Sequence, residues 1–158
     1  MNRKYLTLTS RVNEELSGLK RIVLRIQKAY ECAEKSNDDL YLDSVALNLH
    51  GFYSAMENIF ELIAKNVDQT IPDGELWHQE LLKQMLTEIK QVRPSIISRE
   101  TFEMLNEYRA FRHVVRNVYT FNLSFKKLKP LVDDLNSVFE KTKKEIEEFV
   151  NFIESSQT

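Results

Sequence analysis

The sequence predicts an all-α protein, an up-and-down helical bundle of about five helices, and three observations support this fold class. Only three glycines and three prolines occur in 158 residues, so few positions interrupt a helix. Apolar residues recur three and four positions apart over long stretches, which is the spacing of one helix face. No stretch alternates apolar and polar residues as a half-buried strand does. The length suits one domain with a sizeable core, which we place at residues 1–158.

The first two predicted helices are long. One ends near Ser36, where polar turn-forming residues follow, and its apolar stripe comprises Val12, Leu16, Leu19, Val23, Ile26, Tyr30 and Ala33. The next extends from about Leu40 to Val67, and its main stripe comprises Leu42, Val45, Leu49, Phe52, Met56, Ile59, Ile63 and Val67. A second stripe on this helix, Ala46, His50, Tyr53, Glu57, Phe60 and Ala64, is also mostly apolar. A helix that is apolar on two sides is expected to be central and buried.

Three further helices are predicted after the turn at 71–74. The third helix begins near Leu76 and is expected to end at 92–94, before a proline. Ser98 is the predicted N-cap of the fourth helix, and Glu100 favours the dipole of its first turn. A connection is predicted over 120–129, because a residue that precedes a proline disfavours helix. The fifth helix is therefore expected to begin near Pro130 and to carry an apolar stripe as far as Ile153.

Composition excludes several classes of function. The net charge of −2 gives no global basic field of the kind that marks many nucleic-acid binders. The single Cys32 provides neither a disulfide framework nor a thiolate metal site, and it suits a reducing cytosol. No run approaches the roughly 18 apolar residues of a membrane span, and no apolar signal core follows the first residues. With no phosphate-binding glycine loop and no metal-ligand spacing, we expect a cytoplasmic protein without cofactor or metal.

The segment 107–119 carries the most informative pattern. Read as a helix, it has one apolar stripe formed by Met104, Tyr108, Phe111, Val115 and Val118. A different face, within an arc of about 100°, carries Arg109, Arg112, His113 and Arg116. Three guanidiniums and an imidazole in two turns repel one another, so their positive charge must be offset. A phosphate, a buried carboxylate or solvent can do this.

Glu57 is the candidate for a buried carboxylate, because a charged side chain on a buried helix needs a charged partner. We expect it to pair with one or more of the three arginines, which is a purely structural role. One carboxylate cannot neutralise three arginines, and the surplus charge beside His113 supports a functional site instead. The sequence supports the two interpretations about equally. For Trp77 and His78, the prediction is an aromatic core anchor followed by a histidine that faces water.

Three segments together resemble a known family: 51–60 in the second helix, 72–78 with its Trp77-His78 pair, and 111–119 in the fourth helix. They are similar to the HEPN superfamily, and more closely to HepT-like proteins, over roughly 40–123. The resemblance implies a helical homodimer and a metal-independent ribonuclease, whose signature is an arginine followed after four to six residues by a histidine. It also implies a minimal nucleotidyltransferase as the cognate antitoxin, which can modify a tyrosine near the motif.

The motif of this chain departs from the usual HepT-like order of Arg-Asn, three residues, His, one residue, Tyr. Anchored on Arg116, that order places Phe121 at the histidine position and Leu123 at the tyrosine position. The available His113 lies before Arg116 and three residues separate it from Arg109.

Two functions therefore follow from the resemblance. In the first, the chain is a ribonuclease toxin with His113 as the acid–base group, and Arg109 and Arg116 as phosphate clamps. Arg112 is an auxiliary cation or the partner of Glu57, and Tyr119 is the candidate modification site. In the alternative, the chain is a catalytically inactive partner that binds a nucleotidyltransferase, an RNA or a nucleotide.

Overall fold

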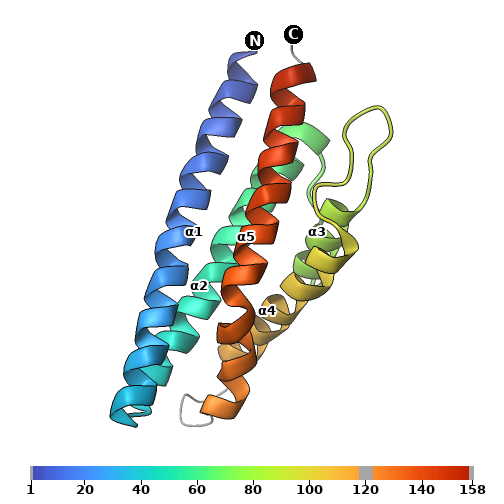
Figure 1. The fold of residues 1–158 in the computed structure, drawn as a ribbon. Helices are drawn as coiled ribbons and strands as arrows, with labels where there is room; N and C mark the ends of the chain where they lie inside the picture. Colours follow the sequence, from blue (N-terminus) through green and yellow to red (C-terminus); the bar gives the residue numbers. More distant parts are fainter. Residues whose placement is uncertain (1, 118–122, 157–158) are drawn as a thin grey trace.

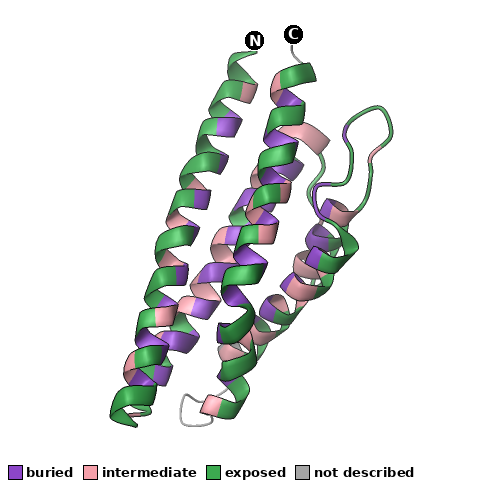
Figure 2. Ribbon diagram, viewed as in Figure 1, coloured by how far each residue is buried: buried purple, intermediate pink, exposed green. Residues whose placement is uncertain are grey.

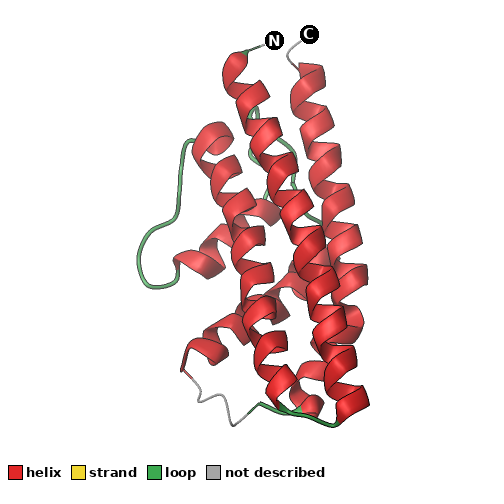
Figure 3. Cartoon of the chain, turned by 90° about the vertical axis from the view of Figure 1, so that its left-hand side faces the viewer, coloured by secondary structure: helices red, strands yellow, loops and turns green. Residues whose placement is uncertain are grey.

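The computed structural model of the chain describes residues 2–117 and 123–156, except for the side chains of residues 116 and 117. Within these residues the chain forms five α-helices and no strand, which confirms the predicted all-α bundle (Figures 1 and 3). The helices are α1 (Arg3–Ser36), α2 (Leu40–Ile63), α3 (Trp77–Leu86), α4 (Arg99–Asn117) and α5 (Phe125–Ser156). A π-helical turn, η1 (Ala64–Asp68), continues α2.

Helices α1, α2 and α5 lie lengthwise beside one another, and α3 and α4 cover one side of this group (Figure 1). The turn between α1 and α2 reverses the chain. Asn37 caps α1 there in the left-handed region, with φ of 51°, a conformation that asparagine tolerates better than most residues. The turn predicted at 71–74 lies later, because residues 71–73 are irregular and the Trp77 N–H donates to the Gly74 carbonyl at 3.4 Å. Gly74 begins this turn with φ of 87°, which favours glycine.

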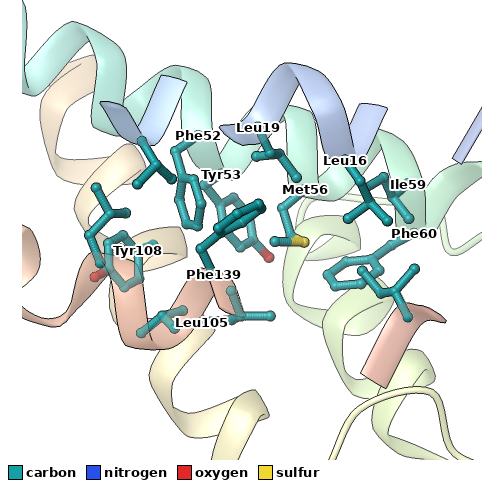
Figure 4. Close-up of a cluster of buried hydrophobic side chains, with 14 of the residues drawn as sticks. Leu16, Leu19, Phe52, Tyr53, Met56, Ile59, Phe60, Leu105, Tyr108 and Phe139 are labelled. Carbon is teal, nitrogen blue, oxygen red and sulfur yellow. The ribbon is translucent and has the colours of Figure 1, made fainter. Parts of the chain in front are cut away.

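Helix α2 is central, as its two apolar stripes predicted, because it packs against α1, α3, α4 and α5. Several of its large side chains are completely buried: Phe52, Tyr53, Met56, Ile59 and Phe60. They meet Leu19 of α1, Tyr108 of α4 and Phe139 of α5 in one cluster (Figure 4). Each such side chain contributes about 1.5–3 kcal/mol on burial. Buried positions elsewhere follow the inner faces of the helices (Figure 2).

Helix α3 ends at Leu86, earlier than the sequence predicted, and a buried arginine accounts for the difference. The guanidinium of Arg93 is paired with Asp68 of η1 and also donates to the backbone carbonyls of Gln84, Thr87 and Pro94. The chain after Leu86 folds around this group instead of continuing as helix. Hydrogen bonds with Asp68 and three carbonyls thus replace helical hydrogen bonds in the segment 87–94.

Helix α5 begins at Phe125, so the predicted connection over 120–129 is wrong for its last five positions. Ser124 is the cap that the sequence analysis missed: its Oγ accepts a hydrogen bond from the Lys127 N–H at 3.3 Å. Pro130 lies inside the helix on an exposed position, where it removes one backbone hydrogen bond, and water can reach the carbonyl left unpaired. At α4 the predicted cap is confirmed, because Ser98 Oγ accepts from the Thr101 N–H at 3.2 Å.

No helix in the described part of the chain combines the length and the apolar character that crossing a bilayer requires.

Candidate functional site

A pocket of about 360 Å³ lies between the start of α3 and the middle of α4. Its lining comprises Glu75, Leu76, His78, Gln79, Arg109, Ala110, Arg112, His113 and Val114. Three of the four residues that the sequence singled out on α4 therefore line one cavity. The opposite wall, which comes from the residues around the start of α3, was not part of the predicted site.

The orientation of α4 differs from the predicted one by about one residue. Its buried positions are Thr101, Leu105, Tyr108 and Arg112, with spacings of four, three and four. The predicted stripe is buried only at Tyr108, whereas its members Met104, Phe111 and Val115 are half-buried; Val118 lies outside the described residues. Arg112 thus belongs to the core-facing side of the helix, and this rotation sends its guanidinium toward α2.

Arg112 pairs with Glu57, which confirms that this buried carboxylate has an arginine partner. Nη2 of Arg112 lies 3.1 Å from Oε1 of Glu57, and Nη1 lies 3.2 Å from the hydroxyl of Ser54. The guanidinium also stands 5.1 Å from the centre of the Tyr53 ring, a cation–π distance. Both charged side chains are almost fully buried, so the pair is held in a medium where leaving either charge alone is costly.

His78 belongs to the same cluster, so the prediction that it faces water is wrong. Its Nδ1 lies 2.8 Å from Oε2 of Glu57 and 2.6 Å from Nη2 of Arg112. The imidazole stacks at a tilt on Trp77, with ring centres 3.7 Å apart, and Trp77 packs on the core as predicted. The side chain is 27% exposed and forms part of the pocket lining.

Arg109 and His113 occupy the outer part of the pocket. Nε of Arg109 donates to Oδ1 of Asn106 at 2.8 Å, and this neutral acceptor does not offset the positive charge of the guanidinium. His113 is exposed and lies one turn further along α4. The two side chains therefore present a cation and a titratable ring to the same cavity.

A second carboxylate, Glu61, follows Glu57 by one turn of α2. Burial raises the pKa of Glu61, the negative charge of Glu57 raises it further, and His78 and Arg112 act in the opposite direction. Glu61 is therefore electrostatically coupled to the cluster that Glu57 forms with Arg112 and His78.

Comparison with known protein families shows which family this chain belongs to. A family model described as HepT-like protein matches residues 44–153, which is more than half of the chain. The chain belongs to the HepT-like family. No curated protein and no solved structure matches it.

The matched segment of this HepT-like protein begins within α2 and ends within α5, so it includes every residue of the pocket. The structure thus brings together Arg109, Arg112 and His113 at the pocket, with Glu57 bonded to Arg112 from behind. The side chain of Arg116 and the whole of Tyr119 lie outside the described residues. Among the residues that are described, no group of three or more His, Cys, Asp or Glu is arranged to hold a metal ion.

His78 is the site residue that the sequence analysis missed. The available signal was its position directly after Trp77, within a segment that resembles HepT-like proteins. The half-buried Trp77 packs the first turn of α3 against the core, and the next side chain then points about 100° around the helix. Which side of α3 faces α2 depends on tertiary packing, which the sequence pattern does not specify.

Proposed function

We propose that this protein is a HepT-like toxin that cleaves RNA without a metal ion, acts in the cytoplasm as a homodimer, and is neutralised by a cognate nucleotidyltransferase. The observation that carries the proposal is the pocket, in which Arg109 and His113 of α4 lie beside Arg112 and His78. In a chain of the HepT-like family, this is the combination of groups that phosphodiester cleavage needs. We take residues 1–158 as one domain, because α1 packs along α2 and α5.

The chemistry assigns a role to each side chain. Attack by a ribose 2′-hydroxyl requires a group that moves a proton, and His113 is that acid–base group. Charge on the phosphorane requires cations, which Arg109 and Arg116 supply as phosphate clamps. Arg112 is bonded to Glu57, so its role is to hold the pocket wall and to add positive potential rather than to grip substrate.

The proposed neutralisation by the nucleotidyltransferase acts through modification of Tyr119, three residues after Arg116 in the sequence. An adenylate added to this tyrosine by the nucleotidyltransferase would place its phosphate against the arginines of α4 and occupy the charge site that RNA needs.

A second function, that of a catalytically inactive partner for a nucleotidyltransferase, RNA or nucleotide, is favoured by one observation. Glu57 neutralises Arg112 inside the protein, so one member of the predicted cation cluster already has an anionic partner. The positive charge left for an external phosphate is smaller, and a site of lower charge suits binding better than transition-state stabilisation.

The deciding experiment compares wild type with His113→Ala on total bacterial RNA in the presence of EDTA. We expect wild type to cleave and the variant to lose roughly 100-fold or more in rate. Arg99→Ala is the matched control, because Arg99 is an exposed cation at the start of α4. Intact RNA after incubation with wild type, together with normal growth of cells that express it without a partner, would refute the ribonuclease and leave the binding function.

A further inference from the structure

We propose that His78 is the second proton-transfer residue of this pocket and receives the proton of the 2′-hydroxyl, while His113 supplies a proton to the leaving oxygen. The inference rests on the proposed ribonuclease function and adds a residue from α3 to it. Cleavage by an internal hydroxyl needs both a base and an acid, and one histidine cannot serve both at once. The pocket contains two histidines, which come from different helices.

The imidazole of His78 is held on two sides. Glu57 meets Nδ1 with both carboxylate oxygens, at 2.9 and 2.8 Å, and Trp77 stacks on the ring face. Glu57 is itself fixed by Arg112. Within the described part of the chain, the polar contacts of the ring involve Nδ1 and the stacking contact involves the ring face, so we assign Nε2 as the nitrogen that meets a ligand in the pocket.

Nδ1 faces two groups, the Glu57 carboxylate, which can only accept a hydrogen bond, and Nη2 of Arg112, which can only donate one. In the tautomer whose Nδ1 proton is donated to Glu57, Nε2 keeps a lone pair. When Nε2 accepts a proton, the negative charge of Glu57 stabilises the imidazolium that forms. A carboxylate behind a histidine has this orienting and stabilising role in acyl-transfer triads. Glu57 is therefore a positioning residue, and His78 is the group that meets the substrate.

The proposed step balances as follows. The 2′-oxygen forms a bond to phosphorus, the bond from phosphorus to the 5′-oxygen breaks, and the products are a 2′,3′-cyclic phosphate and a 5′-hydroxyl. The 2′-hydroxyl proton passes to Nε2 of His78, and a proton from the His113 imidazolium passes to the departing 5′-oxygen. Arg109 faces the non-bridging oxygens, and exchange with solvent returns both rings to their starting forms.

Other charged groups surround His78: the carboxylates of Glu57, Glu61 and Glu75, and the guanidiniums of Arg109 and Arg112. A pH profile of the wild type reports this whole set, so the test needs variants at the ring itself.

The experiment measures RNA cleavage in EDTA from pH 5 to pH 9 for wild type, His78→Ala and His78→Gln, with thermal unfolding as a check of the fold. Lys83→Ala is the control, since Lys83 is exposed on α3 outside the pocket. We expect a bell-shaped profile for wild type. The rate of RNA cleavage should be roughly 100-fold lower in each His78 variant than in wild type. That rate should no longer fall toward acidic pH, because the base is gone.

Added imidazole separates the two roles. It should restore the RNA cleavage rate of His78→Ala in proportion to the concentration of neutral imidazole. It should restore the cleavage rate of His113→Ala in proportion to the concentration of imidazolium. A folded His78→Ala that imidazole does not restore, or a His78→Gln that cleaves within about threefold of wild type, would overturn the assignment. Glutamine keeps a donor for Glu57, so this second variant answers the question even if alanine unfolds the chain. A wild type that leaves RNA intact would instead refute the ribonuclease function itself.

Discussion

The carboxylate of Glu57 in α2 and the guanidinium of Arg112 in α4 form an ion pair whose side chains are only 6% and 8% exposed. Removal of one partner leaves the other charged and buried, which is far more costly than loss of an exposed pair. We expect Glu57→Ala to lower the free energy of unfolding by about 3–5 kcal/mol. Urea denaturation of wild type and variant measures this difference.

The matched control is Glu100→Ala, which breaks the pair of Glu100 with Lys141. That pair has the same N–O distance, 3.1 Å, but it is solvent-exposed. Its loss should cost less than about 1 kcal/mol. Equal effects of the two substitutions would contradict the role assigned to Glu57.

The sequence predicted that Glu57 needs an arginine, but it could not say which one. A carboxylate between apolar neighbours on a central helix requires a cation, and this argument depends only on α2. The choice of Arg112 depends on the rotation of α4 about its axis. Two stripes one residue apart, one through Met104 and Phe111 and one through Leu105 and Arg112, both have helical spacing. Only the packing of α4 on α2 selects the second.

Most of the helix positions were predictable, because long apolar stripes define α1, α2 and the later part of α5. The beginning of α5 and the end of α3 were not, since both depend on polar groups outside a stripe. At α5 the cap of Ser124 outweighs the tendency of Pro130 to begin a helix. After α3 the pair of Arg93 with Asp68 joins residues 25 positions apart, and no periodicity indicates such a contact.

The Arg93 site gives the second prediction. All three nitrogens of its guanidinium donate hydrogen bonds. Two of these bonds go to Asp68, and the other bonds go to backbone carbonyls. Lysine keeps the charge but offers a single ammonium, which cannot reproduce this fork. Arg93→Lys should lower the free energy of unfolding by at least about 2 kcal/mol, because buried acceptors lose their donors. The exposed Arg99→Lys should change it by less than about 0.5 kcal/mol, and a similar result for Arg93→Lys would contradict this account.

Tyr53 gives the third prediction. Its hydroxyl is buried, with no hydrogen-bond partner among the described residues, and burial raises its pKa. Tyr53→Phe keeps the ring that Arg112 faces, so it should leave stability unchanged or raise it by up to about 1 kcal/mol. In Tyr108→Phe, by contrast, the lost hydroxyl donates to the Leu131 carbonyl at 2.6 Å, so stability should fall by about 0.5–1.5 kcal/mol. Thermal and urea unfolding measure the change in stability of each variant relative to wild type. The changes for Tyr53→Phe and Tyr108→Phe should differ in sign or clearly in size.

The fourth prediction concerns pH. The pKa of Glu61 is raised in the folded protein, so folding favours its protonated form. Ionisation then opposes folding: the cost appears as the pH rises through the unfolded-state pKa and is complete above the folded-state pKa. Glu61→Gln removes this cost, and it should raise Tm more at pH 7 than at pH 3.5.

Glu31 is the control of opposite sign, because a hydrogen bond from Lys35 lowers its pKa. Its ionised form contributes stability above the unfolded-state pKa, and this contribution is lost as the pH falls through the folded-state pKa. Glu31→Gln should therefore lower Tm slightly at pH 7 and less at pH 3.5. The same pH trend in both variants would show that local charge does not control the difference.

The last prediction is homodimerisation through the region around α4. Val114 is a large apolar side chain that is 51% exposed, and it lies at the pocket beside Ala110 and the charged groups of the site. A second copy that covers this face would remove Val114 from water and bring a second set of cations to the same phosphate. Light scattering at micromolar concentration should give the mass of a dimer. Val114→Glu should give a monomer and reduce RNA cleavage, whereas Leu24→Glu, an exposed leucine on α1, should alter neither. A monomeric wild type that cleaves RNA would show that one pocket is sufficient.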